Sequence, residues 1–183
     1  QEFFALTEGE LVDGNFVPFR VREGDEASCL NLNRAQKPRL LGVKPEMLEG
    51  RFTFAKLMSD TFVKTDAWSL LSKTSVPDRA RVERAEIPAI GDANSIQWAM
   101  GKQTGDTIDY VDERGQPFKV RIVGAVANSI LQGQLIIDET EFVKRFPGES
   151  GYRMFLVDAP SNAVAQVSAT LSRAMQDVGL ELT

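Results

Sequence analysis

The sequence contains no histidine among its 183 residues, and its single cysteine is Cys29. The absence of histidine excludes Ser-His and Cys-His nucleophile activation, histidine proton shuttles and histidine-liganded metals. One cysteine can neither close an internal disulfide nor build a thiolate metal cage. Cys29 lies in an alternating run, which favours a small buried hydrophobic residue. A reactive thiol is the alternative, although no basic residue stands beside Cys29 in the sequence to lower its pKa.

Long hydrophobic runs are also missing. No stretch approaches the roughly 18 consecutive apolar residues that predict a membrane-spanning helix, and no signal peptide opens the chain. The sequence begins with Gln1 rather than Met, so we expect a processed or excised piece of a longer protein.

The composition is that of an ordinary globular protein, with 43% hydrophobic and 26% charged residues. A chain of this length forms one large domain or two small ones, and it can bury enough surface to fold without a metal or a disulfide. The net charge of −5 opposes binding to phosphate backbones, so nucleic acid is not an expected partner.

Hydrophobic periodicity predicts a mixed α+β protein. Strands are expected at residues 16–21, 29–33, 40–43, 135–137 and 152–157. The first of these contains Pro18, which favours a bent strand or a sheet edge. Helices are expected at residues 45–48, at 67–71 behind a cap at Asp66, and at 162–178, where apolar residues recur every three and four positions.

Two further short helices are predicted from capping residues. Asp92 or Asn94 can cap a helix that carries Ile96, Trp98 and Met100. Asp138 and Glu141 form a D-x-x-E variant of the capping box for a helix that ends before Pro147-Gly148.

Residues 87–126 carry the most informative pattern. A helical segment ends at Gly101, and Gly105-Asp106-Thr107-Ile108 then opens an alternating strand. The polar turn at residues 112–115 leads into a return strand with Phe118, Val120, Val123 and Gly124, and the two strands are predicted to form an antiparallel hairpin.

This order, a "GD-T-I" strand start and an "F-x-V-x-x-V-G" return strand, resembles the extracytoplasmic domain of MacB/FtsX-type ABC transporter permeases. The resemblance covers about residues 81–183. It implies a two-lobed periplasmic core domain, with residues 1–85 and 147–183 in a mixed α/β lobe and residues 86–146 in an inserted β-rich lobe.

The resemblance also implies a non-catalytic role at the inner membrane, with the domain facing the periplasm. The partners would be the transmembrane helices of the same permease, a cytoplasmic ABC ATPase, and a periplasmic protein or lipoprotein cargo, and the intact transporter could be a dimer. No cofactor is implied. The domain would couple helix motion to efflux, lipoprotein release or mechanotransmission.

Candidate chemical sites each have a simpler structural interpretation. Asp106, Asp109, Asp112 and Glu113 could hold a metal or act as acids, but their spacing is not that of an EF-hand and turn carboxylates explain them. Residues 148–151, Gly-Glu-Ser-Gly, lack the G-x-S-x-G spacing of a nucleophile elbow.

Two aromatic groups could line apolar grooves. One contains Trp98 and Met100, and the other contains Trp68, Phe52 and Phe54; we expect both groups in the core. The sequence therefore assigns no catalytic, cofactor or metal residue and leaves the partner-binding residues unidentified. A periplasmic ligand- or peptide-binding sensor module is the alternative function, and an enzyme built on carboxylates is a third.

Overall fold

The computed structural model describes residues 15–24, 37–58, 64–72 and 86–175. The chain divides into two compact units, one of residues 1–17 and 155–183 and the other of residues 18–154. The predicted strand at residues 29–33, Cys29 and the end of the last predicted helix lie outside the described residues.

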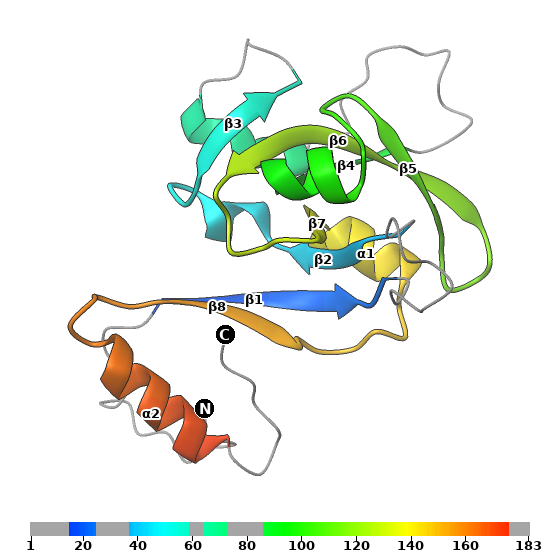
Figure 1. Cartoon of the computed structure of the whole chain (residues 1–183). Helices are drawn as coiled ribbons and strands as arrows, with labels where there is room; N and C mark the ends of the chain where they lie inside the picture. The colour runs from blue at the N-terminus through cyan, green and yellow to red at the C-terminus, as the bar shows by residue number, and fades with distance from the viewer. Residues whose placement is uncertain (1–14, 25–36, 59–63, 73–85, 176–183) are drawn as a thin grey trace. The chain divides into compact units, whose positions relative to one another are not determined.

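A mixed β-sheet organises the fold (Figure 1). Its strands are β1 (Asn15–Arg22), β2 (Arg39–Val43), β3 (Thr53–Leu57), β4 (Glu86–Asp92), β5 (Thr107–Val111), β6 (Pro117–Ala127), β7 (Gln134–Asp138) and β8 (Met154–Asp158). The strand order is β3-β6-β4-β7-β2-β1-β8, and β5 pairs with β6. The β2–β7 and β4–β6 pairs are parallel, whereas β1–β2, β3–β6, β4–β7 and β5–β6 are antiparallel.

The pairing of β4 with β6 contains a bulge. Ala89 pairs with Ile122, but the next residue, Ile90, pairs with Gly124, so that Val123 is passed over. A bulge of this kind shifts the alternation of side chains by one position. Val120 and Ile122 therefore share a core cluster with Ala125 rather than with Gly124.

One face of the sheet packs against α1 (Glu139–Arg145) and the short helix η5 (Ser95–Ala99). The buried cluster on this face joins Phe142 and Phe146 at the α1 end to Ile96 and Met100 at the η5 end. The intervening members come from β2, β4, β5, β6 and β7. Leu135 and Ile137 of β7 belong to this cluster, and Ile136 between them is also buried, which explains the uninterrupted apolar run in this strand.

A second packing region surrounds Trp68 on η3 (Lys64–Leu71), which contacts η2 (Pro45–Leu48), β3, β4 and β6. The Trp68 ring meets Phe54 edge-on at 5.2 Å between ring centroids, and its indole nitrogen donates a 3.1 Å hydrogen bond to the carbonyl of Arg51. Phe52 packs against the same ring at 6.1 Å, although its φ of 63° is unusual for a bulky residue. Trp68 thus holds a strained turn in place.

The unit of residues 1–17 and 155–183 contains α2 (Val164–Ala174). Its inward side chains are Val167, Thr170 and Leu171, three to four residues apart, as the apolar periodicity predicts. The helix begins after Ala163, and no side chain caps it.

The predicted α+β class is confirmed, and so are the hairpin at residues 112–115, the strand at residues 135–137 and the N-cap at Asp138, whose carboxylate accepts from Thr140 N at 2.7 Å. Pro18 lies within β1. Two details are wrong. Asp66 lies inside η3 rather than at its cap, and Glu141 bonds Lys144 and Arg145 instead of completing a capping box.

The division into lobes at residues 86–146 stays a prediction. Among the described residues, no helix is both long and apolar enough to cross a membrane.

Gly42 of β2 lies directly against the Phe142 ring of α1. A Cβ atom at this position would lie 2.6 Å from the Phe142 ring. We expect Gly42→Ala to destabilise the protein by about 1–3 kcal/mol in urea unfolding, because the ring must move in a packed core.

Phe142→Leu provides the control for this clash. In the double variant the smaller side chain leaves room for the new methyl group, so the combined loss of stability should be less than the sum of the two single losses. Additive losses would show that Gly42 and Phe142 do not compete for the same space.

Candidate interaction surface

A buried carboxylate lies where β4 ends and η5 begins. Asp92, the last residue of β4, is 0% exposed. One of its oxygens accepts from Ser95 N at 2.9 Å and from Ser95 Oγ at 3.1 Å, and the other accepts from Ser129 N at 3.1 Å. A buried carboxylate needs such donors, because an unpaired charge away from water is strongly unfavourable. Of the two predicted caps, Asn94 stands at the N-cap of η5 without a capping bond from its side chain. Asp92 instead accepts from Ser95 N at the start of the helix, and it also reaches a distant loop.

The loop of residues 128–133 is held by the same network. Ser95 Oγ accepts from Gly133 N at 2.9 Å, and Ser129 Oγ accepts from Leu131 N at 2.9 Å. Asn128 begins the loop with a φ of 47°, a conformation that asparagine tolerates. Figure 1 shows this loop, between β6 and β7, running beside η5. Two segments 37 residues apart in sequence are thereby joined.

These two segments present the most exposed large hydrophobic side chains of the described chain. Trp98 on η5 is 75% exposed, and Ile130 in the loop is 72% exposed. Their exposed polar neighbours in the sequence are uncharged amides, Asn94, Gln97 and Gln132. We name these five residues the Trp98–Ile130 surface. It is a candidate binding surface, because the two most exposed large apolar side chains lie on segments that hydrogen bonds join.

The prediction that Trp98 is a core residue is wrong, whereas Met100 is buried as expected. Ile96 and Met100 occupy the inner side of the short helix, which leaves Trp98 on its outer side. The even spacing of Ile96, Trp98 and Met100 could have indicated this conflict. On a helix, residues two apart do not share a face. Trp68 and Phe54 are buried, as predicted, and Phe52 is half-buried.

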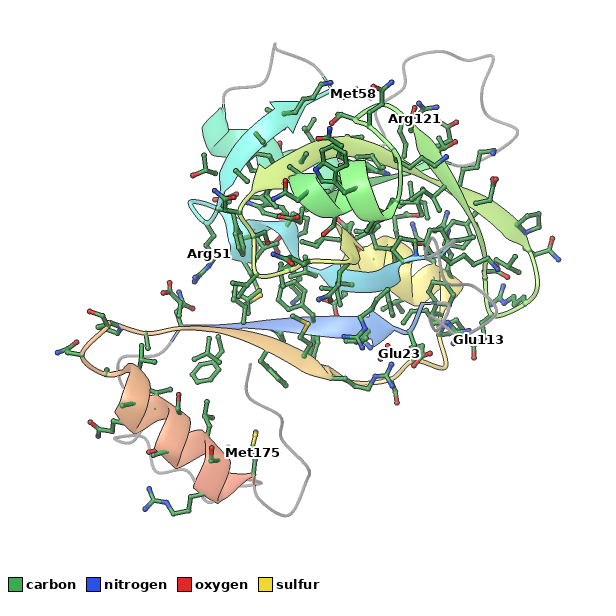
Figure 2. The ribbon with its side chains drawn as sticks, viewed as in Figure 1. Glu23, Arg51, Met58, Glu113, Arg121 and Met175 are labelled. Atoms are coloured by element: carbon green, nitrogen blue, oxygen red, sulfur yellow. The ribbon has the colours of Figure 1, made fainter. Side chains whose placement is uncertain are left out.

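The four clustered carboxylates of the hairpin each have a structural partner. Asp106 accepts from Gln103 N at 2.9 Å, and Asp109 pairs with Lys119 at 2.6 Å. Asp112 accepts from Arg114 N and Gln116 N at 2.8 Å, which closes the turn. Glu113 at the hairpin tip (Figure 2) accepts from Gly148 N at 2.7 Å.

The Gly-Glu-Ser-Gly segment is a loop fastened by charge. The Glu149 carboxylate forms ion pairs with Arg22 at 2.7 Å and with Arg153 at 3.5 Å. The backbone carbonyl of Glu149 accepts a hydrogen bond from Arg20 at 3.2 Å. Its glycines act as loop residues, with Gly151 at a φ of 75°. In the described part of the chain, no cluster of three or more Cys, Asp or Glu side chains could hold a metal ion.

Beside this loop, Arg20 bonds Glu139 at 2.7 Å and lies 5.1 Å above the Tyr152 ring. The hydrogen bond from the Tyr152 hydroxyl to Glu139 raises the pKa of Tyr152, burial and the Glu139 charge raise it further, and Arg20 opposes the shift. On α1, burial pushes the pKa of Glu141 upward, but hydrogen bonds from Lys144 and Arg145 outweigh it and the pKa is lowered.

We expect Asp92→Ala to destabilise the protein by about 2–4 kcal/mol in urea unfolding, because the Ser95 and Ser129 amides lose their buried acceptor. Asp112→Ala is the matched control. It removes a carboxylate that also accepts two backbone bonds, but from exposed amides that water can satisfy, so its effect should be about 1 kcal/mol or less. Equal losses would contradict a special role for Asp92.

The raised pKa of Tyr152 predicts a pH dependence at alkaline pH. Because the folded pKa exceeds the unfolded value of about 10, the hydroxyl contributes its full stability below that pH and loses it as the pH rises through the folded pKa. Wild-type stability should therefore fall more steeply than that of Tyr152→Phe above about pH 10, measured by urea unfolding. In a Glu139→Gln background, Tyr152→Phe should change the slope less, because the largest cause of the raised pKa of Tyr152 is removed.

No family model matches the sequence, and no curated protein matches it. The structure is similar to the extracellular domain of the ABC-type transporter YknZ from Gram-positive bacteria, with 14% identity, a TM-score of 0.43, and coverage of 95% of this chain and 81% of that one. It is also similar to the periplasmic region of MacB from Actinobacillus actinomycetemcomitans, with 12% identity, a TM-score of 0.42, and coverage of 90% and 67%. At TM-scores below 0.5 they do not by themselves carry a function to this chain.

Proposed function

We propose that this chain is a non-catalytic extracytoplasmic domain of an ABC transporter permease. The observation that carries the proposal is the hairpin at residues 105–124, because its sequence resembles the permease pattern and both of its ends are fixed to the sheet. In such a protein the domain transmits the motion of membrane helices, and a separate cytoplasmic ATPase hydrolyses ATP.

The start of the hairpin is fixed by Arg121 of β6 (Figure 2). Its guanidinium bonds Glu86 of β4 at 2.6 Å and donates to the carbonyl of Gly105 at 2.6 Å. Gly105 has a φ of 102°, which only glycine adopts readily, and its amide donates to the carbonyl of Ile122 at 2.7 Å. The Glu86 hydrogen bond is the largest cause of the raised pKa of Arg121, so this ion pair persists across the physiological pH range.

The end of the return strand is fixed by close packing. A Cβ atom at Gly124 would lie 3.2–3.4 Å from Leu57, Ile90 and Phe54, which belong to β3 and β4. The glycine therefore lets three strands approach closely. Together, Arg121 and Gly124 make the hairpin part of a stiff body rather than a loose appendage.

A stiff body is the physical requirement for transmitting motion, since a rigid-body displacement needs packed interfaces that do not deform. The hairpin carboxylates serve this requirement, because each one satisfies a backbone amide or an ion pair. The proposed setting is the inner membrane, with the domain on the periplasmic side and attached to transmembrane helices of the same permease. Lobe division at residues 86–146, a dimeric transporter and a periplasmic cargo belong to the same proposal.

A ligand-binding sensor module is the second candidate, favoured by the exposure of Trp98 and Ile130. The two functions differ in what the chain needs. A transmitter requires the Arg121 attachment but no ligand, whereas a sensor requires a ligand that changes the stability of the isolated chain.

The test uses the full-length membrane protein with its ATPase in proteoliposomes. Arg121→Met should lower transport-coupled ATP hydrolysis by roughly fivefold or more, because the start of the hairpin at Gly105 loses its side-chain link to Glu86 of β4, while assembly with the ATPase stays unchanged. Lys119→Met is the matched control. Lys119 lies on the same strand and pairs with Asp109, which is 81% exposed, so its loss should have little effect.

Equal activity of the two variants would contradict the transmitter role. The full-length gene gives a second test. If it encodes no segment of about 20 apolar residues on each side of this chain, the transmitter role is contradicted as well.

A further inference from the structure

The Trp98–Ile130 surface differs in charge from the rest of the chain. The segments that carry it, residues 93–103 and 127–137, contain no Asp or Glu and one basic residue, Lys102. The whole chain has 26 acidic and 21 basic residues. The two segments that form the surface therefore carry almost no charge, although the protein is acidic.

The two apolar side chains are exposed and held on a fixed backbone. Ser129 N and Gly133 N, on either side of Ile130, are bonded to Asp92 and Ser95, the residue that opens the helix carrying Trp98. The Ser129 bond is buried and the Gly133 bond is partly buried, so the backbone beneath the side chains is set before any partner arrives, which reduces the entropy lost on binding.

The chemistry of the surface fits a neutral lipid bilayer. Tryptophan is enriched at the boundary between headgroups and acyl chains, where its ring is apolar and its N–H finds a polar acceptor. Isoleucine partitions into the acyl region, and the amides of Asn94, Gln97 and Gln132 suit the headgroup layer. An absence of carboxylates matters here, because it removes the groups that are hardest to bring to a lipid surface.

The area argues against a stable protein complex. A specific protein interface needs about 800 Å² from each partner, whereas a tryptophan and an isoleucine together offer on the order of 300 Å². Insertion into lipid has no such minimum. Its strength grows with the apolar area that is buried, and a weak contact becomes effective when the protein is already held near the membrane.

We propose that the Trp98–Ile130 surface binds a neutral lipid surface, with Trp98 and Ile130 as the inserted side chains. The binding is weak for the isolated chain and gains strength from any attachment that keeps the chain near a bilayer. This proposal does not rest on the transporter role, and its failure would leave the Arg121 test unaffected.

Trp98 itself supplies the measurement. The chain has two tryptophans, and Trp68 is only 2% exposed, so a change in emission on adding vesicles reports on Trp98. Phosphatidylcholine vesicles, at lipid concentrations on the order of millimolar, should shift the emission to shorter wavelength and carry the protein upward in a flotation gradient. Added salt should not abolish either effect, because the surface is uncharged.

Ile130→Asp should weaken partitioning by about tenfold or more, since it places a charge in the inserted loop. Trp98→Ala should do the same in the flotation assay. The matched control is Val143→Asp, which changes another exposed hydrophobic residue, on α1 and 40% exposed. It should bind like the wild type. Both sites are exposed, so unchanged thermal unfolding of the two Asp variants confirms that folding is intact.

Absence of an emission shift and of flotation would overturn the proposal, as would an equal loss in Val143→Asp or binding that requires anionic lipid. If vesicles had no effect but Ile130→Asp weakened a complex of the full-length protein with another protein, the surface would be a protein-docking site and the lipid proposal would be wrong.

Discussion

The buried carboxylate of Asp92 is the interaction on which the most distinctive part of the molecule depends. Its described partners are all neutral donors, from Ser95 and Ser129, so its charge is satisfied by dipoles that the backbone must hold in place. The carboxylate therefore cannot keep its burial if either segment moves away. This couples the short helix η5 to the loop after β6 more firmly than hydrophobic contact would, because hydrogen bonds are directional.

The ion pairs of the same unit have a different character. Arg22, Arg39 and Arg153 pair with Glu149 and Glu23, but these side chains remain partly exposed, and each such pair contributes about 1 kcal/mol or less. They order the loop of residues 147–153 without determining the fold. Arg20 and Arg121 are better shielded, and both join elements far apart in sequence, so their pairs specify which strands and helices meet.

Local signals predicted much of the fold. The hairpin, the buried β7 and the cap at Asp138 follow from turn residues, apolar runs and capping, which act over a few positions. The order of strands did not follow, because it depends on long-range pairs such as β2 with β7. The candidate surface was missed for a related reason. A tryptophan in an apolar sequence suggests a core, and only the inward direction of Ile96 and Met100 reveals that Trp98 points outward.

The bulge at Val123 has a consequence for how this chain can change over time. Before the bulge, the even-numbered residues Val120 and Ile122 face the buried cluster. After it, the odd-numbered residue Ala125 faces the same cluster, because the bulge adds one residue to the strand. Removing one residue from β6 would turn every later side chain to the other face, so that Gly124 would no longer leave room for β3 and β4. Substitutions within this strand can be absorbed by repacking, whereas insertions and deletions cannot. We therefore expect the number of residues in β6 to be more conserved among homologues than their identities.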